Sequence, residues 1–202
     1  SCIFIRGNKE DYWLNRRKDQ NCDWKSGNRS VMAMIYNYNS LNAKDLDFFE
    51  TLPISQSIRF AGMEPVLACH GTPFENQKAL LSEDLFVQKC EERYIICGHT
   101  HMQGFVSDGK KKIINAGAVG VPLKSPKKTQ YMILTSDGKD WKPEFLSLEY
   151  DVDTVIKEIH ESGLWDASPY WCRITEHLLD TGELPHGTVL NHVMKLNDYQ
   201  DP

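Results

Sequence analysis

The stretch YIICGHTH, residues 94–101, decides the fold of this 202-residue chain. Its first four residues are apolar and predict a short buried strand, and a glycine then turns the chain into a pair of histidines. His70 directly follows a second apolar run, residues 65–69, in the same way. Because ligands of α/β proteins collect at the carboxyl ends of strands, this pattern predicts a binding site at one edge of a sheet.

The chemistry of the three histidines indicates a metal site. Neutral imidazole is the commonest side-chain ligand for ions such as Zn, Mn, Fe and Ni. On an extended strand His99 and His101 would point to opposite faces, but in a turn they can reach two neighbouring ions. A single histidine after a strand is usually structural. Three histidines, each following a strand in this way, favour a metal site over that interpretation.

Asn8 has a comparable position, after Gly7 and an apolar run over 2–5 that predicts a buried strand. Its amide oxygen can act as a hard, neutral metal ligand. The same oxygen can instead cap the helix that we expect over 9–17. Both interpretations use one atom, so they compete.

Composition and charge exclude several classes of protein. Hydrophobic residues make up 41% and charged residues 25% of the chain, as in ordinary globular proteins. There is no apolar run long enough for a membrane helix and no basic, then apolar, leader pattern. A net charge of −5 argues against a general nucleic-acid binder. The six cysteines form no CxxC pair, so we expect reduced thiols in a cytoplasmic protein.

Hydrophobic patterning predicts a mixed α/β body over 1–150 and an acidic helical extension over 151–202 packed on it. The extension carries an apolar face at helical spacing, formed by Val152, Val155, Ile156 and Ile159. We expect this face to pack on a surface flanking a sheet, and the extension to form a cap near the site's rim. The body is predicted to contain strands over 56–61, 64–69, 94–97, 103–107, 112–116, 130–135 and 144–150, and helices near 9–17, 31–38, 42–52 and 78–91. In the extension we expect helices over 151–162, 168–181 and 187–197.

The acidic residues are concentrated in the extension, so the body has a positive net charge. Its basic residues lie close together in the sequence. They admit two interpretations: solvated loops, or a positive rim that attracts an anionic substrate. The residues concerned are Lys110, Lys111, Lys112, Lys124, Lys127 and Lys128.

Four short blocks occur in a fixed order: GNKE at 7–10, HGTP at 70–73, GHTH at 98–101 and NAGAVG at 115–120. Together they resemble the motifs of the calcineurin-like metallophosphoesterases, in particular the small bacterial-type branch, over about residues 3–135. The resemblance implies a four-layer α/β/β/α sandwich with two sheets face to face. It also implies hydrolysis of a phosphomonoester or phosphodiester by a hydroxide that bridges two divalent ions, such as Mn, Fe, Ni or Zn.

The resemblance also implies roles for individual residues. Asn8, His70 and His99 would bind one ion, and His101 would bind the other. Asn8, His70 and Lys9 would be the catalytic residues, with the Lys9 ammonium stabilising the leaving oxygen. The simpler interpretation of Lys9 is a solvated lysine at a helix start.

The sequence departs from the family pattern in ways that affect activity. The family's Asp-x-His and Gly-Asp blocks, which supply the carboxylate bridging the two ions, have no counterpart here, and the sequence opens on Ser1. We therefore expect a domain that is N-terminally incomplete, binds one ion instead of two, and hydrolyses aryl phosphates poorly. Lys9 stands where the family often has histidine, and Ala118 where it usually has serine.

Two other classes of function stay open. One is a catalytically inactive scaffold or binding protein that keeps the fold, as the retromer subunit with this fold does. The other is a structural zinc protein, although the paired cysteines typical of such sites are lacking. The expected partner is a phosphate-ester substrate, with no membrane or specific nucleic acid indicated. The sequence leaves the oligomeric state, the substrate and the metal open.

Overall fold

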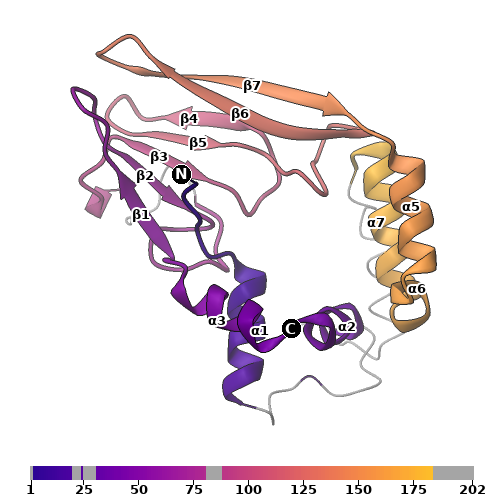
Figure 1. Cartoon of the computed structure of the whole chain (residues 1–202). Helices are drawn as coiled ribbons and strands as arrows, with labels where there is room; N and C mark the ends of the chain where they lie inside the picture. Colours follow the sequence, from indigo (N-terminus) through magenta and orange to yellow (C-terminus); the bar gives the residue numbers. More distant parts are fainter. Residues whose placement is uncertain (1, 20–23, 25–30, 81–87, 184–202) are drawn as a thin grey trace.

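Figure 1 shows the computed structural model of the chain, which describes residues 2–19, 24, 31–80 and 88–183. The helices are α1 (Asn8–Lys18), α2 (Met32–Ser40), α3 (Ala43–Thr51), α5 (Val152–Glu161), α6 (Leu164–Ala167) and α7 (Pro169–Thr181). The strands are β1 (Ser55–Ile58), β2 (Val66–Cys69), β3 (Tyr94–Cys97), β4 (Gly104–Ser107), β5 (Lys112–Asn115), β6 (Lys128–Ser136) and β7 (Trp141–Glu149). The mixed α/β class with C-terminal helices is confirmed.

The strands form two sheets. In the five-stranded sheet the order is β1-β2-β3-β5-β4, with β2, β3 and β5 parallel and the two edge strands antiparallel to their neighbours. Strands β6 and β7 form an antiparallel hairpin that lies over this sheet (Figure 1). The three parallel strands therefore end at one edge, where the chain can bring loop residues together.

Alternating side chains of the parallel strands build two cores. Val66, Tyr94 and Ile114 face the hairpin and pack with Trp141, whose indole N–H donates to the Glu64 carbonyl at 2.9 Å. The opposite face carries a second cluster, made of Leu67, Cys69, Leu80, Ile95, Cys97 and Ile113. Because successive strand residues point to opposite faces, these nearly continuous apolar runs fill both cores.

Replacing Ile95 with alanine is expected to lower the free energy of unfolding by about 2–5 kcal/mol, because its side chain is 0% exposed and its removal leaves a cavity. Ile133 of β6 is 44% exposed, so Ile133→Ala is the matched control, with a loss under about 1 kcal/mol. Urea denaturation of both variants checks the difference. Equal losses would contradict the placement of the core.

The predicted strand over 2–5 is wrong. Ile3 and Phe4 are 49% and 55% exposed, and the segment joins neither sheet within the described residues. Its first backbone hydrogen bond comes at Arg6, whose N–H donates to the Pro53 carbonyl at 2.9 Å. An apolar run becomes a strand only where another strand lies alongside to pair with it, and the described residues provide none here.

Helix boundaries were predicted with mixed success. The helices expected near 9–17, 31–38, 42–52, 151–162 and 168–181 are confirmed to within a few residues. Of the helix expected over 78–91, residues 78–80 are not helical, 88 and 89 are helical, 90 and 91 are not, and 81–87 lie outside the described residues. The helix expected over 187–197 lies entirely outside them.

The C-terminal helices pack chiefly on one another. Val152 is buried and the other three residues of the predicted apolar face are partly buried, while Asp153, Lys157 and Glu161 are exposed as expected. The strongest contacts of α5 within the described residues are with α6 and α7, and the packing of its apolar face on a sheet-flanking surface stays a prediction. Figure 1 shows these helices standing beside the sheets at the end of the β6–β7 hairpin. Within the described part of the chain, no helix is long and apolar enough to cross a membrane.

Candidate functional site

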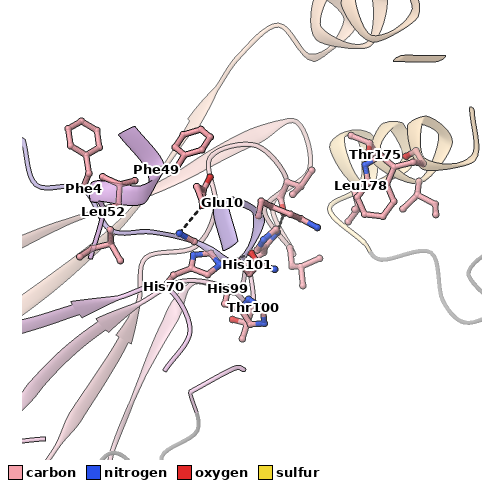
Figure 2. Close-up of a pocket in the computed structure, with 18 of the residues that line it drawn as sticks. Phe4, Glu10, Phe49, Leu52, His70, His99, Thr100, His101, Thr175 and Leu178 are labelled. Carbon is pink, nitrogen blue, oxygen red and sulfur yellow. Dashed lines mark hydrogen bonds between the residues drawn. The ribbon is translucent and has the colours of Figure 1, made fainter. Parts of the chain in front are cut away.

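A cavity of about 910 Å³ opens at the carboxyl edge of the parallel strands. Figure 2 shows its three histidines between Phe4, Phe49 and Leu52 on one side and Thr175 and Leu178 of α7 on the other. Apart from Thr175, the polar side chains of the wall are contributed by the start of α1 and by the turns after β2 and β3, and include Asn8, Lys9, His70, His99, Thr100 and His101. The structure thus places all four residues expected to bind metal on one cavity.

The histidines meet because two parallel strands end side by side. His70 follows β2, and its carbonyl accepts a hydrogen bond from the Gly98 N–H, at 2.9 Å, just after β3. His99 and His101 both adopt left-handed backbone conformations, with φ of 65° and 57°. This conformation is uncommon outside glycine and is found at functional sites. The turn brings both side chains to the same cavity despite their spacing of two.

Asn115 holds this turn in place. Its amide donates to the Gly98 carbonyl at 2.6 Å and to the Thr100 hydroxyl at 2.9 Å, and its side-chain oxygen accepts from the Gly117 N–H at 2.9 Å. These three bonds tie the end of β5 to the turn after β3. Asn115 therefore positions the histidines, which its sequence motif alone did not reveal.

Asn8 is the first residue of α1, and the cap of this helix is Gly7. The Glu10 carboxylate accepts the Gly7 N–H at 2.8 Å, so the helix start is satisfied without the asparagine. The capping interpretation of Asn8 is therefore wrong, because its amide oxygen lies 3.1 Å from His70 Nε2 instead. The His70 and His99 rings are 5.3 Å apart and nearly perpendicular.

Burial and mutual repulsion keep two of the imidazoles neutral at pH 7. The pKa of His70 is lowered to about 4, first by burial and then by the neighbouring His99 and His101. Burial, followed by His101, also lowers the pKa of His99. His101 Nδ1 lies 3.0 Å from the Val121 carbonyl, to which it donates, and this leaves Nε2 as the atom with a lone pair. Neutral imidazoles are the form that binds metals.

The donors around His70 fit one divalent ion in part. Two ligands of the same ion lie about 3 Å apart, which matches the separation of Asn8 Oδ1 and His70 Nε2. However, the described residues contain no group of three or more His, Cys, Asp or Glu side chains arranged to hold a metal. The carboxylate on the wall, Glu10, is occupied by the Gly7 N–H. The cavity therefore offers neutral ligands for one ion, not a carboxylate bridge for two.

Lys9 lies at the rim of the cavity with its ammonium over two aromatic rings. Its Nζ is 5.4 Å from the centre of the Tyr12 ring and 5.9 Å from that of Trp171 on α7. Partial desolvation lowers the pKa of Lys9, against the opposing attraction of Glu10. The side chain is still exposed, so it is a solvated helix-start lysine that also faces the site.

Of the two interpretations of the basic residues, the positive rim does not hold for the β4–β5 hairpin. Residues 110–112 lie at the turn end of the hairpin, whereas the cavity lies toward the other end, where Gly104 pairs with Asn115. Near α7, Lys127 pairs with Asp180 at 3.1 Å, and Lys128 pairs with Glu149 at 3.4 Å. These lysines do not line the cavity, so they give no support for substrate attraction.

Sequence reasoning missed most of the apolar wall. Helix α3 contributes Phe48 and Phe49, and α7 contributes the side chains Trp171, Ile174, Thr175 and Leu178. The helix expected over 168–181 thus lines the cavity as α7, although nothing in the sequence identified which of its residues face the site.

Comparison with known proteins identifies a family model and a relative that match most of the chain. Residues 2–139 match the sequence model of the calcineurin-like phosphoesterase superfamily domain. An uncharacterized protein of Methanocaldococcus jannaschii is 25% identical over 191 residues, which cover 85% of this chain and 73% of that protein.

Two solved structures share the fold. A hypothetical protein of Pyrococcus horikoshii has a TM-score of 0.66 at 14% identity, over 90% of this chain and 73% of its own. A metallophosphoesterase of Sphaerobacter thermophilus has a TM-score of 0.64 at 18% identity, over 89% and 76% respectively. At these identities the likeness supports the fold alone.

Proposed function

The chain belongs to the calcineurin-like phosphoesterase superfamily, and we propose that it hydrolyses a phosphate monoester or diester with the help of a divalent metal ion. The observation that carries the proposal is the meeting of Asn8, His70, His99 and His101 on one cavity. These side chains come from three separate parts of the chain, and two of them need strained backbone. Strained backbone costs free energy, and proteins keep it mostly at functional sites. The strain at His99 and His101 therefore supports a functional cavity.

Each of these residues has a proposed task. Asn8, His70 and His99 would hold the ion, and His101 would face a second ion or the substrate. A bound divalent ion supplies a Lewis acid that polarises the phosphoryl oxygen and lowers the pKa of water. Lys9 would place its positive charge against the phosphate or the leaving oxygen. The apolar wall would exclude bulk water from the polar end of the cavity.

A binding protein without turnover is the second candidate. It is favoured by one observation, which is that the described residues lack a group of three His, Cys, Asp or Glu ligands. A site with neutral ligands alone neutralises less of the charge that develops on phosphorus. The cavity would then recognise a phosphate group without cleaving its ester.

Metal content and turnover separate the two candidates. We expect the purified chain to bind about one Mn²⁺ and to hydrolyse bis(p-nitrophenyl) phosphate slowly, with EDTA abolishing the reaction. Metal is measured by mass spectrometry after dialysis, and turnover by release of nitrophenol. Turnover that persists after complete removal of metal would contradict the proposal. Metal bound without turnover would favour the binding protein.

A further inference from the structure

The Lys9 ammonium lies near two aromatic rings that come from distant parts of the chain, Tyr12 and Trp171. Tyr12 lies one turn along α1, and Trp171 lies near the start of α7. Both rings are within the range of about 6 Å at which an ammonium interacts with an aromatic face. Among the described residues lining the cavity, Lys9 is the only lysine or arginine. Its position therefore decides where the cavity has a positive charge.

Helix α7 holds Trp171 in a defined place. Cys172, Ile174, Leu178 and Leu179 are buried, so the helix is packed along one side. Trp171 itself is 46% exposed and reaches the cavity wall. The C-terminal end of α7 is also held by hydrogen bonds, so the helix that carries Trp171 is fixed along its length.

The loop that bonds to the C-terminal end of α7 also bonds to His101. The backbone N–H groups of Lys124 and Lys127 donate to the carbonyls of Gly182 and Leu179, at 2.7 and 2.9 Å. The preceding residues of the same loop bond to His101, through the Leu123 N–H at 3.0 Å and the Val121 carbonyl at 3.0 Å. One loop therefore ties α7 to the turn that carries His99 and His101, and fixes Trp171 relative to the histidines.

We propose that Trp171 is a positioning residue that holds the Lys9 ammonium over the cavity, where it binds the phosphate group of the substrate. The inference rests on the proposed function, since it takes the ligand to be a phosphate ester. The ring face of Trp171 attracts the ammonium, and limits the rotamers of a long, flexible side chain. Helix α7 thereby takes part in phosphate recognition.

A double-mutant cycle tests the proposal with inorganic phosphate as the probe. Calorimetry gives the dissociation constant of phosphate for the natural chain, Trp171→Ala, Trp171→Phe, Lys9→Met and the double variant Lys9→Met/Trp171→Ala. We expect Trp171→Ala to weaken phosphate binding about three- to fivefold, and Trp171→Phe to stay within about twofold, because it keeps an aromatic face. In the Lys9→Met background Trp171→Ala should have no further effect.

Turnover of bis(p-nitrophenyl) phosphate adds a second readout. Trp171→Ala should raise KM more than it lowers kcat, since Lys9 binds the phosphate in the ground state as well. Thermal melting checks that the variants fold. The proposal is overturned if Trp171→Ala weakens phosphate binding equally with and without Lys9, or leaves it unchanged, or if the natural chain binds no phosphate. Phosphate binding without turnover would overturn the proposed function and leave this inference standing.

Discussion

His99→Ala is expected to lower metal-dependent hydrolysis at least about 100-fold, and to weaken binding of Mn²⁺. His99 lies in a left-handed turn with φ of 65°, its ring 5.3 Å from that of His70. Alanine keeps the fold but removes one of the few donors on this side of the cavity. Turnover of bis(p-nitrophenyl) phosphate and metal content after dialysis are measured together, because loss of a ligand lowers both.

His177→Ala is the matched control. His177 is an exposed histidine on α7, and it is not part of the cavity wall. Its removal should change turnover less than about twofold and stability by less than about 0.5 kcal/mol. If both variants lose activity equally, the loss comes from something other than the cavity. If His99→Ala retains both metal and turnover, the assignment of the site is wrong.

The elements that sequence patterns predicted well are those decided by neighbouring residues. The strands expected on either side of Gly62 and of Gly109 pair antiparallel, and the two glycines have positive φ, of 74° and 87°, as tight turns often require. Asn42 caps α3 by accepting from the Lys44 and Asp45 N–H groups. Turn and cap chemistry acts over two to four residues, so it can be recognised without the fold.

Predictions failed where distant parts of the chain decide the outcome. The apolar run over 2–5 has the composition of a buried strand, yet strand formation requires a partner that sequence patterns do not specify. Asn8 resembled a cap by residue type, but Glu10 accepts the N–H of the capping residue Gly7, and the Asn8 side chain contacts His70 instead. A short polar residue beside a glycine is thus ambiguous until its tertiary neighbours are known.

In the candidate site, too, residues in local motifs were predicted and residues brought in by distant parts of the chain were not. The four metal-binding candidates were identified because each follows a strand or a glycine turn in a recognisable motif. Trp171 comes from a helix more than a hundred residues farther along the chain than His70, and its spacing on α7 suits a solvent-facing position equally well. The hydrogen bonds between α7 and the loop before β6, which its sequence pattern does not indicate, help to place it at the cavity.

Gly71→Ala is expected to destabilise the protein by at least about 1–3 kcal/mol, because a methyl group at this position has no space. A Cβ on Gly71 would lie 2.5 Å from the Lys78 carbonyl oxygen and 2.8 Å from those of Asn76 and Glu75. All three are backbone atoms in a loop that is closed by Thr72, whose N–H donates to the Glu75 carbonyl at 2.9 Å. Such a loop cannot give way at one atom, so it has to move as a unit.

Gly120→Ala is the matched control, because no described atom lies within 4 Å of its added Cβ and its φ is not positive. Its free energy of unfolding should change by less than about 1 kcal/mol. Urea denaturation compares the two variants, and equal stabilities would show that the loop over 75–78 does not cover Gly71.

Gly71→Ala is also expected to affect catalysis, because Gly71 lies beside residues of the candidate site. Gly71 directly follows His70, and the His70 carbonyl bonds to Gly98 at the start of the histidine turn. Moving the chain at residue 71 therefore disturbs His70 and the turn carrying His99 together. We expect Gly71→Ala to lose phosphate-ester turnover even at temperatures where it remains folded, whereas Gly120→Ala keeps it. Full activity in folded Gly71→Ala would mean that His70 acts independently of this backbone junction, and that its alignment with Asn8 is not what the cavity uses.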